Sequence, residues 1–143
     1  MFLGEFDHTI DDKGRIAIPA RFREELGEGL VVTRGFDRCL QAFPHHVWQP
    51  LKDRISAMSL GSEDARNLRR LLFSGAAEVE VDRQGRILIP QNLREYAGLS
   101  EQVVIAGMDT FFELWSNERW RTVIATLDNT GGTIAEQLSN LGI

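Results

Sequence analysis

Two short segments of the chain each carry a carboxylate and a guanidinium four residues apart. "DDKGRIAIP" begins at Asp11, and "DRQGRILIP" begins at Asp82, which is 71 positions later. In each segment the arginine, Arg15 or Arg86, follows a glycine and begins an alternating apolar pattern. An arginine presents a planar fork of N–H donors that suits phosphate and the edge of guanine. Its repetition in the same register therefore indicates a binding surface for a nucleic acid.

Other residue combinations do not form a pattern typical of catalysis or metal binding. Asp11 and Asp82 are explained by turn formation, and an arginine four residues on would keep each ionised. His45 and His46 are adjacent, so on a helix they point about 100° apart and do not readily share a metal. No glycine-rich phosphate loop is present, and nothing orients Cys39 toward His45 as a nucleophile pair. We therefore expect no enzyme activity, cofactor, metal site or small-molecule substrate.

The distribution of charge favours nucleic acid more than the total charge does. A formal net charge of −5 argues by itself against a polyanionic partner. However, the stretches from Lys13 to Arg23 and from Arg83 to Arg94 contain several basic residues and no acidic ones. A phosphate backbone responds to the local density of cations. Because these stretches coincide with the two repeated segments, double-stranded DNA is the expected partner.

Length and composition are those of one medium-sized domain, or of two small halves that share a core. The chain has 143 residues, of which 43% are hydrophobic and 26% charged, so extensive disorder is not expected. No apolar run reaches the roughly 18–20 residues that span a bilayer, and the N-terminus does not resemble a signal peptide. The single cysteine, Cys39, excludes an internal disulfide and suits a reducing cytosol. We therefore expect a cytoplasmic protein with no membrane contact.

Each repeated segment predicts a tight turn followed by a strand. Asp11 and Gly14 occupy the first and fourth places of a type I turn, and Asp82 and Gly85 repeat them. A glycine at the fourth place can take positive φ, so we expect each turn to close a bulged hairpin. In the strand that follows, alternation predicts that the isoleucines face the core and that the arginine faces outward.

After the strand, each repeat predicts a short helix and then a hairpin. Pro19 and Pro90 are expected as the first helical residues, and Gly27 and Gly98 as the stops. Two β-rich runs broken by Gly and Asp then predict one hairpin in each repeat. The hairpins are expected over residues 30–43 and 103–115. Tryptophans at helical spacing follow each hairpin, and we expect them in the core and not as a platform for stacked bases.

The correspondence divides the chain into four parts. We predict a first repeat over 5–47 and a second over 76–119, with connector helices over 48–75 and C-terminal helices over 120–143. Within the last part, "DNTGG" (128–132) is expected to be a loop ahead of a final helix. Two repeats are too few for a solenoid, so a pair of half-domains completing one core is the expected arrangement.

The repeated D-x-x-G-R-I-x-I-P segments, each followed by a short helix and a hairpin, resemble AbrB-type swapped-hairpin DNA-binding units. Two such units, with "MFLGEFDHTIDDKGRIAIPARFRE" at the start and "RRLLFSGAAEVEVDRQGRILIP" in the middle, resemble the MraZ family of transcriptional regulators. The resemblance implies an α+β fold. In it, duplicated AbrB-like swapped-hairpin (double-split β-α-β) half-units form one small β-barrel with flanking helices. It also implies a homo-oligomer, a ring with the repeated segments on one DNA-facing surface.

The same resemblance implies a role and a set of contact residues. The role is repression of the protein's own cell-division and cell-wall operon, through short direct repeats in its promoter, by a nucleoid-associated protein. Asp11 and Arg15 match the family pattern, as do Asp82 and Arg86, whereas the second turn carries its cation one place earlier than the first. The expected DNA-binding residues are Asp11, Lys13, Arg15, Asp82, Arg83 and Arg86.

Two alternatives to a DNA-binding repressor remain. AbrB-type units also occur in antitoxins, so the chain could be an antitoxin-like module that binds a protein. Such chains usually carry one unit and a long toxin-binding tail, whereas here a second complete unit stands in place of the tail. A ring-forming scaffold without a nucleic-acid role is the other alternative.

Overall fold

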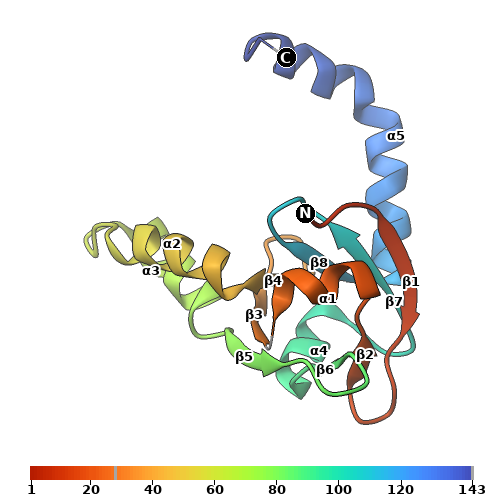
Figure 1. Cartoon of the computed structure of the whole chain (residues 1–143). Helices are drawn as coiled ribbons and strands as arrows, with labels where there is room; N and C mark the ends of the chain where they lie inside the picture. The colour runs from red at the N-terminus through yellow and green to blue at the C-terminus, as the bar shows by residue number, and fades with distance from the viewer. Residues whose placement is uncertain (28, 143) are drawn as a thin grey trace.

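The protein, described here from a computed structural model over residues 1–27 and 29–142, has eight strands and five helices in those residues (Figure 1). Every strand pair is antiparallel, so the predicted α+β class is confirmed. The strands are β1 (Glu5–Thr9), β2 (Arg15–Ala17), β3 (Gly29–Arg34), β4 (Leu40–Pro44), β5 (Ala77–Glu80), β6 (Arg86–Leu88), β7 (Gln102–Gly107) and β8 (Phe112–Ser116). The helices are α1 (Ala20–Leu26), α2 (His45–Ser56), α3 (Glu63–Leu72), α4 (Gln91–Ala97) and α5 (Asn117–Ser139).

Six of the strands form one sheet, and their order shows that the two halves of the chain are interleaved. The order is β1-β7-β8-β4-β3-β5, and strands β1 to β4 come from the first half of the chain. The first strand of each half, β1 or β5, therefore adds to the hairpin of the other half. The remaining strands, β2 and β6, pair with each other as a two-stranded ribbon. Each half thus completes the sheet of the other.

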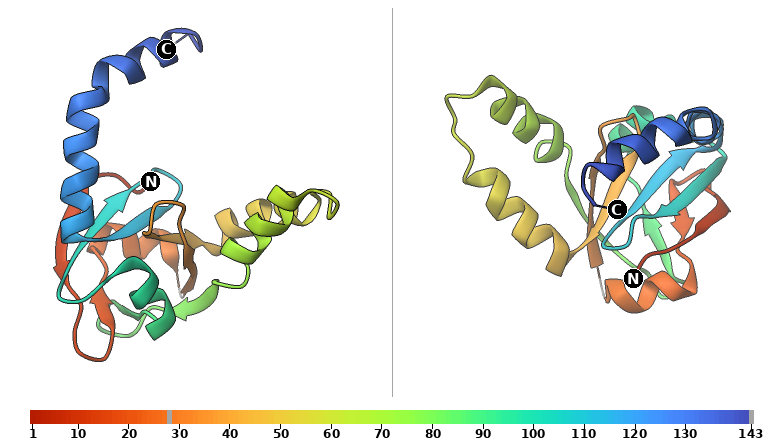
Figure 2. Two further views of the ribbon diagram at one scale, coloured as in Figure 1. Left: turned by 180° about the vertical axis from the view of Figure 1, so that it is seen from behind. Right: turned by 90° about the horizontal axis from the view of Figure 1, so that it is seen from above.

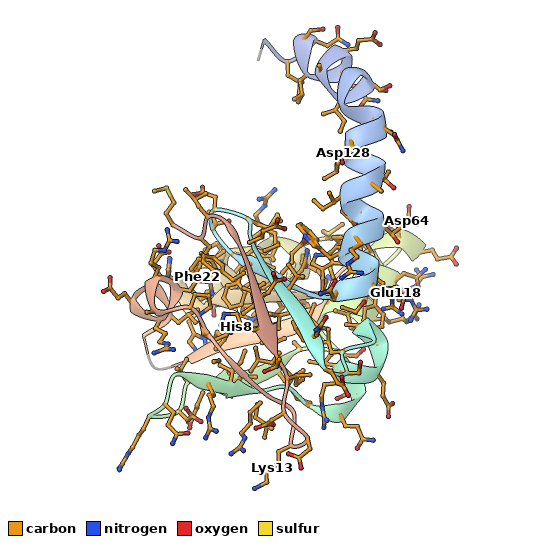
Figure 3. All side chains as sticks on the ribbon, turned by 90° about the vertical axis from the view of Figure 1, so that its right-hand side faces the viewer. His8, Lys13, Phe22, Asp64, Glu118 and Asp128 are labelled. Carbon is orange, nitrogen blue, oxygen red and sulfur yellow. The ribbon has the colours of Figure 1, made fainter. Side chains whose placement is uncertain are left out.

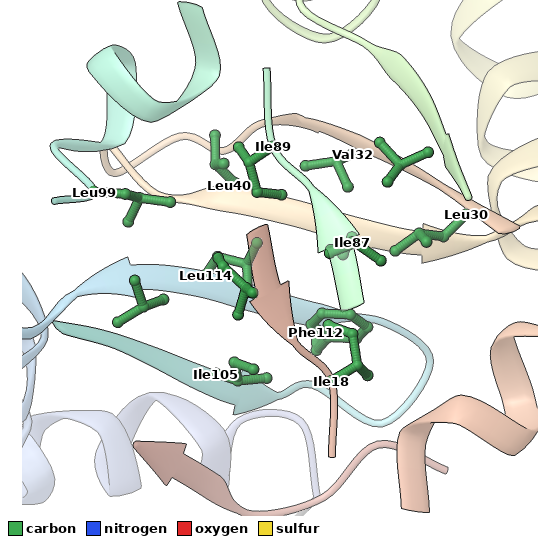
Figure 4. Packing of buried hydrophobic residues seen from close by; sticks show 14 of the residues in the cluster. Ile18, Leu30, Val32, Leu40, Ile87, Ile89, Leu99, Ile105, Phe112 and Leu114 are labelled. Atoms are coloured by element: carbon green, nitrogen blue, oxygen red, sulfur yellow. The ribbon is translucent and has the colours of Figure 1, made fainter. Parts of the chain in front are cut away.

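The six-stranded sheet is open within the described residues, so the predicted closed barrel is not formed there. β1 and β5 are its edges, and each is paired along its length with one strand. Beyond each edge the chain turns and continues into a ribbon strand, β2 or β6, which pairs with its counterpart from the other half. In the part of the chain that the structure describes, the sheet does not close into a barrel because the segments that follow its two edge strands, β2 and β6, pair with each other as a separate ribbon. Figure 4 shows the ribbon packed against the sheet.

Alternation in the ribbon places its isoleucines in the core, as predicted. Ile16, Ile18, Ile87 and Ile89 are each at most 1% exposed, whereas Leu88 on the opposite side is 54% exposed. They belong to the same buried cluster as these side chains of the sheet: Leu30, Leu40, Ile105, Phe112 and Leu114 (Figure 4). Full burial of an isoleucine contributes about 1.5–3 kcal/mol, so the pattern anchors the ribbon to the sheet.

The short helices α1 and α4 end where the sequence predicts. Gly27 and Gly98 follow them with positive φ angles of 61° and 65°, which residues with a side chain rarely adopt. Pro19 and Pro90 directly precede the helices and are not their first helical residues. Their backbone is still extended at ψ 138° and 148°, so each proline stands one place earlier than predicted.

The hairpins β3–β4 and β7–β8 form as predicted, and α2 and α5 leave from their ends. The Trp48 ring on α2 packs 5.6 Å from that of Phe43. The Trp120 ring on α5 packs 5.8 Å from that of Trp115. The tryptophans therefore serve packing, as predicted.

α2 and α3 form a helical arm, residues 45–72, that projects from the body of the molecule (Figures 1 and 2). Ser62 accepts a hydrogen bond from the Ala65 N–H at 3.3 Å and so caps α3. The Arg69 guanidinium of α3 donates to the carbonyls of Ile55 and Ser56 at the end of α2. These bonds satisfy carbonyls that a helix leaves free at its C-terminus and join the two helices into one unit.

The predicted loop over residues 128–132 is wrong, because α5 runs without interruption from Asn117 to Ser139. Gly131 and Gly132 lie inside it, and neither has a positive φ angle. Glycine lowers helix stability by only about 1 kcal/mol relative to alanine, so the pair weakens the helix without ending it. α5 projects from the body on a different side from the arm (Figures 1 and 2).

None of the described helices combines the length and the apolar character that crossing a membrane requires.

Candidate nucleic-acid interface

The first repeated segment forms the predicted turn, built by the carboxylate of Asp11. Its Oδ1 accepts hydrogen bonds from the backbone N–H groups of Lys13 at 3.0 Å and Arg15 at 2.8 Å. The Gly14 N–H closes the turn on the Asp11 carbonyl at 3.0 Å, and Gly14 has a φ angle of +90°. Aspartate and glycine are therefore required here for separate reasons, one as an acceptor and the other for its backbone conformation.

The second segment has the same geometry. Asp82 Oδ1 accepts from the backbone N–H groups of Gln84 and Arg86, both at 2.9 Å. The Gly85 N–H donates to the Asp82 carbonyl at 3.0 Å, and the φ angle of Gly85 is +75°. The turn in each repeat is thus confirmed in detail.

Each turn closes its hairpin as predicted, but the hairpin is very short. The Asp11 N–H donates to the Arg15 carbonyl at 3.0 Å, and the Asp82 N–H donates to the Arg86 carbonyl at 2.9 Å. In the first repeat a single bridge, Ile10 to Ile16, joins the two sides of the turn.

The strands after the turns pair across the repeats, with Arg15 opposite Leu88 and Ala17 opposite Arg86. Residues directly opposite in an antiparallel pair share a face, so both arginines lie on the outer face of the ribbon, away from the buried isoleucines.

Each turn is also braced by the other repeat. The Ile18 N–H donates to the Gly85 carbonyl at 2.9 Å, and the Ile89 N–H donates to the Gly14 carbonyl at 2.8 Å. Each of these bonds joins a strand end of one repeat to the turn glycine of the other. The two turns are therefore held as one unit.

Two arginines complete this bracing, and the sequence did not identify their role. Arg23 Nε donates to the Ile18 carbonyl at 2.7 Å, and Arg94 Nε donates to the Ile89 carbonyl at 3.0 Å. A Cβ added at Gly14 would lie 2.8 Å from Cζ of Arg94, and one added at Gly85 would collide with Arg23. Each guanidinium thus lies against the other repeat's turn. The available signal was their equal spacing, since each lies eight residues after Arg15 or Arg86.

The predicted contact arginines are held by the aspartates of their own turns. Arg15 Nε pairs with Asp11 Oδ2 at 2.7 Å, and Arg86 Nε pairs with Asp82 Oδ2 at 3.0 Å. Within the described residues neither guanidinium makes a further protein hydrogen bond through its terminal Nη groups. The backbone N–H of the arginine is the main cause that lowers the pKa of each aspartate. Both carboxylates therefore stay ionised at neutral pH and fix the direction of the arginines.

The remaining predicted residues lie at the tips of the turns. Lys13 and Arg83 are exposed, and Figure 3 shows Lys13 at the end of the molecule, pointing away from the body. Beside the ribbon, an open groove is lined by Arg15 and Arg86 together with Glu78 and Glu80 of β5. The cationic face is therefore bordered on one side by acidic residues.

The groups considered for catalysis or metal binding do not come together. Cys39 is buried, and burial raises the pKa of its thiol to about 12. Its Sγ lies 3.8 Å from a carboxylate oxygen of Glu113, whereas His45 and His46 are exposed on α2. Over residues 1–27 and 29–142, no group of three or more His, Cys, Asp or Glu side chains is placed to hold a metal ion.

One solved structure gives a weak match to the chain. It is the solution structure of PHS018 from Pyrococcus horikoshii, which covers 80% of this chain and 88% of its own at 18% identity and a TM-score of 0.34.

The comparisons of sequence are more specific. The family described as "MraZ protein, putative antitoxin-like" matches the chain twice, over residues 1–71 and 72–137. Similar proteins named "Transcriptional regulator MraZ" occur in Roseiflexus castenholzii, at 58% identity over 99% of both chains, and in Herpetosiphon aurantiacus, at 52% over the whole of both. The relative in Thermomicrobium roseum is 51% identical over 99% of both chains. With matches of this extent, the chain belongs to the MraZ family.

Proposed function

We propose that this protein is a sequence-specific DNA-binding transcriptional regulator that contacts DNA through the two turns and the outer face of the β2–β6 ribbon. The observation that carries the proposal is the cross-braced ribbon, which presents Arg15 and Arg86 on one face. A two-stranded ribbon fits the major groove of B-DNA, where arginine reads guanine. The names of the relatives support the regulatory role.

The geometry suggests a different role in DNA binding for each kind of residue among the six candidates. Asp11 and Asp82 orient the guanidinium groups of Arg15 and Arg86, whose Nη atoms are left for a base edge or a phosphate. Lys13 and Arg83 at the turn tips reach the phosphate backbone, which fixes the position of the protein on the duplex. The two tips differ in the place and type of their cation, so their contacts with DNA differ.

We also propose the assembly and the target implied by the family resemblance. The protein forms a homo-oligomeric ring, binds direct repeats in the promoter of its own cell-division and cell-wall operon, and represses it in the cytoplasm at the nucleoid. A ring suits a subunit of net charge −5, because several modest basic faces engage one DNA segment and raise the avidity. Successive subunits would match successive direct repeats.

The direct test is a binding titration with the DNA upstream of this gene. Fluorescence anisotropy should give tighter binding to that DNA than to a scrambled duplex of equal length and composition. The affinity should also fall as salt is raised, since binding releases counterions from the phosphates. Equal affinity for both duplexes would remove sequence specificity, and no binding to either would favour the scaffold without a nucleic-acid role.

A second candidate, an antitoxin-like protein-binding module, is favoured by the wording of the family description. It predicts that a toxin protein co-purifies with the chain in stoichiometric amount. It does not require the arginines of the ribbon, so their replacement would leave the protein complex unchanged.

A further inference from the structure

Helix α5 carries an apolar stripe that runs along its whole length. Its members recur at alternating intervals of four and three residues, the spacing of one helix face that packs against another helix. The stripe consists of Trp120, Ile124, Leu127, Gly131, Ile134 and Leu138. Leu127 is 45% exposed and Ile134 is 37% exposed, so beyond the first turns of α5 the stripe faces solvent.

A helix with this sequence needs a partner to stay ordered. None of the described residues of α5 is buried. Isolated helices are marginal in water, and the glycine pair with several β-branched residues lowers the helix propensity of α5 further. The stripe therefore requires a covering surface that residues 1–27 and 29–142 of the same chain do not supply.

Comparison of the two repeats shows which kind of partner α5 lacks. α5 begins at Asn117, and α2 begins at the corresponding place in the first repeat, His45. α2 is covered by α3, through buried Ile55 and Leu72 and through the bonds that Arg69 makes to the end of α2. α5 has no such partner within the described residues, which end three residues beyond it. A helix-binding surface from another molecule is the counterpart that α5 lacks.

An apolar groove lies beside the arm and could accommodate the apolar stripe of α5. The groove runs between the arm and the loops of the two β-hairpins, and it is lined mainly by apolar side chains. These include Phe36, Phe43, Val47, Leu51, Leu68 and Phe111. Phe36 is 64% exposed and belongs to the apolar lining of this groove, and a contiguous apolar surface of this kind is typical of an interaction site. The groove can receive one face of an amphipathic helix.

The charges of the two elements are complementary. Residues 122–142, which form most of α5, contain two acidic residues and no basic one. The arm, residues 45–72, contains five basic residues and three acidic ones. One of the basic residues, Arg54, lines the groove. Opposite charges of this kind favour encounter and set the orientation of a complex.

We propose that the α5 stripe of one copy of this protein docks into the arm groove of a second copy. Within one chain the two elements project from different sides of the body, so the contact joins two molecules (Figures 1 and 2). Because stripe and groove are different surfaces, the contact is head-to-tail and can be repeated until a ring closes. The inference identifies the surfaces of the proposed assembly and rests on that assembly, but not on the DNA contact.

Mixing two defective variants tests this contact. The stripe variant, Leu127→Glu with Ile134→Glu, should be unable to dock its helix but keeps its groove. The groove variant, Phe36→Glu with Arg54→Glu, should be unable to receive a helix but keeps its stripe. Light scattering should give each variant alone a mass near 16.2 kDa, well below that of the parent protein. An equimolar mixture should give a species of twice 16.2 kDa and nothing larger.

Matched controls carry the same number of added acidic residues and the same change of net charge, placed on α5 or α2 outside the two surfaces. Asn129→Glu with Thr133→Glu lies on the opposite face of α5, and Gln49→Glu with Lys52→Glu lies on α2 away from the groove. Both controls should assemble as the parent does. Hydrogen exchange of all four variants should match the parent outside α5 and the groove, since every substituted side chain is exposed.

Three results would overturn the proposal. These are a parent of monomeric mass, a groove variant that still assembles, and a mixture that stays monomeric. The second result is the one expected if α5 instead pairs with α5 of another copy. Binding to upstream DNA is scored separately. If the mixture pairs but the parent binds no DNA, the proposed function fails and this interface stands.

Discussion

At the level of single residues, Asp11 and Asp82 each serve the fold and the candidate interface with one carboxylate. One oxygen accepts two backbone N–H groups and builds the turn, and the other holds the Nε of an arginine. The arginine therefore reaches solvent already oriented. Ordering a free arginine side chain costs up to about 2 kcal/mol, so this pairing lowers the cost of binding.

The turn glycines should not tolerate a side chain. Gly14→Val and Gly85→Val are each expected to destabilise the protein by about 1–3 kcal/mol, because a β-branched residue is strained at positive φ. The added atoms would also displace the arginine that lies against each glycine. Thermal or denaturant unfolding measures the loss. Unchanged unfolding midpoints in both variants would contradict the turn geometry.

Arg23 and Arg94 should each stabilise the strand end and turn that they touch. Removing Arg23 should expose the Ile18 amide, which bonds to Gly85, while the Ile89 amide stays protected; removing Arg94 should do the reverse. The loss of protection should correspond to about 1 kcal/mol in each alanine variant, as for a typical hydrogen bond. Native-state hydrogen exchange followed by NMR measures both amides.

Arg21→Ala is the control for that experiment, because it removes the same charge from α1 at an exposed position. It should change neither amide. Equal effects of Arg21→Ala and Arg23→Ala would mean that charge, and not bracing, is what the arginines supply.

At the level of elements, features with a local cause were predictable from the sequence. The turns follow from Asp11 and Gly14, the short helices from their flanking prolines and glycines, and the buried ribbon face from the alternation of isoleucines. These depend on backbone conformation and periodicity, which a few neighbouring residues determine. At the candidate interface, the sequence also predicted that Arg15 and Arg86 share one outer face, and the register of the ribbon agrees.

Features with a non-local cause were not predictable. A strand that pairs within its repeat and one that pairs with the other repeat have the same local pattern, so the sequence did not predict that β2 and β6 pair with each other. The bracing by Arg23 and Arg94 likewise depends on this exchange. The glycine pair in α5 was interpreted as a loop, although its cost of about 1 kcal/mol per glycine is small enough for a helix to continue.

The glycine pair itself gives a prediction for α5. Gly132→Ala should stabilise the helix by about 0.5–1 kcal/mol, because its φ is not positive and nothing lies within 4 Å of an added Cβ. Hydrogen exchange of the amides around residue 132 should slow, and circular dichroism should show no loss of helix. Faster exchange in the variant would mean that the chain is not helical at this point.

For the whole molecule, the distribution of charge gives the ribbon face its role. The chain is acidic overall, and Figure 3 shows the turn cation Lys13 at the opposite end from Asp128 on α5. The acidic residues of β5 border the same face and oppose DNA binding through that side. The proposed DNA contact would therefore have a single orientation, and the proposed assembly would repeat it.

The central claim is that the twin arginines contact DNA, and titrations of upstream DNA at two salt concentrations test it most directly. Arg15→Ala and Arg86→Ala should keep the fold, since both side chains lie on the outer face, and each should weaken binding. A lost phosphate contact should lower the salt slope by roughly one unit, and a lost base contact should cost about 1–3 kcal/mol of discrimination. Arg121→Ala, which removes an exposed arginine from α5, is the control and should bind as the parent does. The account predicts that the double variant binds more weakly than either single variant, whereas a folded double variant with the affinity of the parent would contradict it.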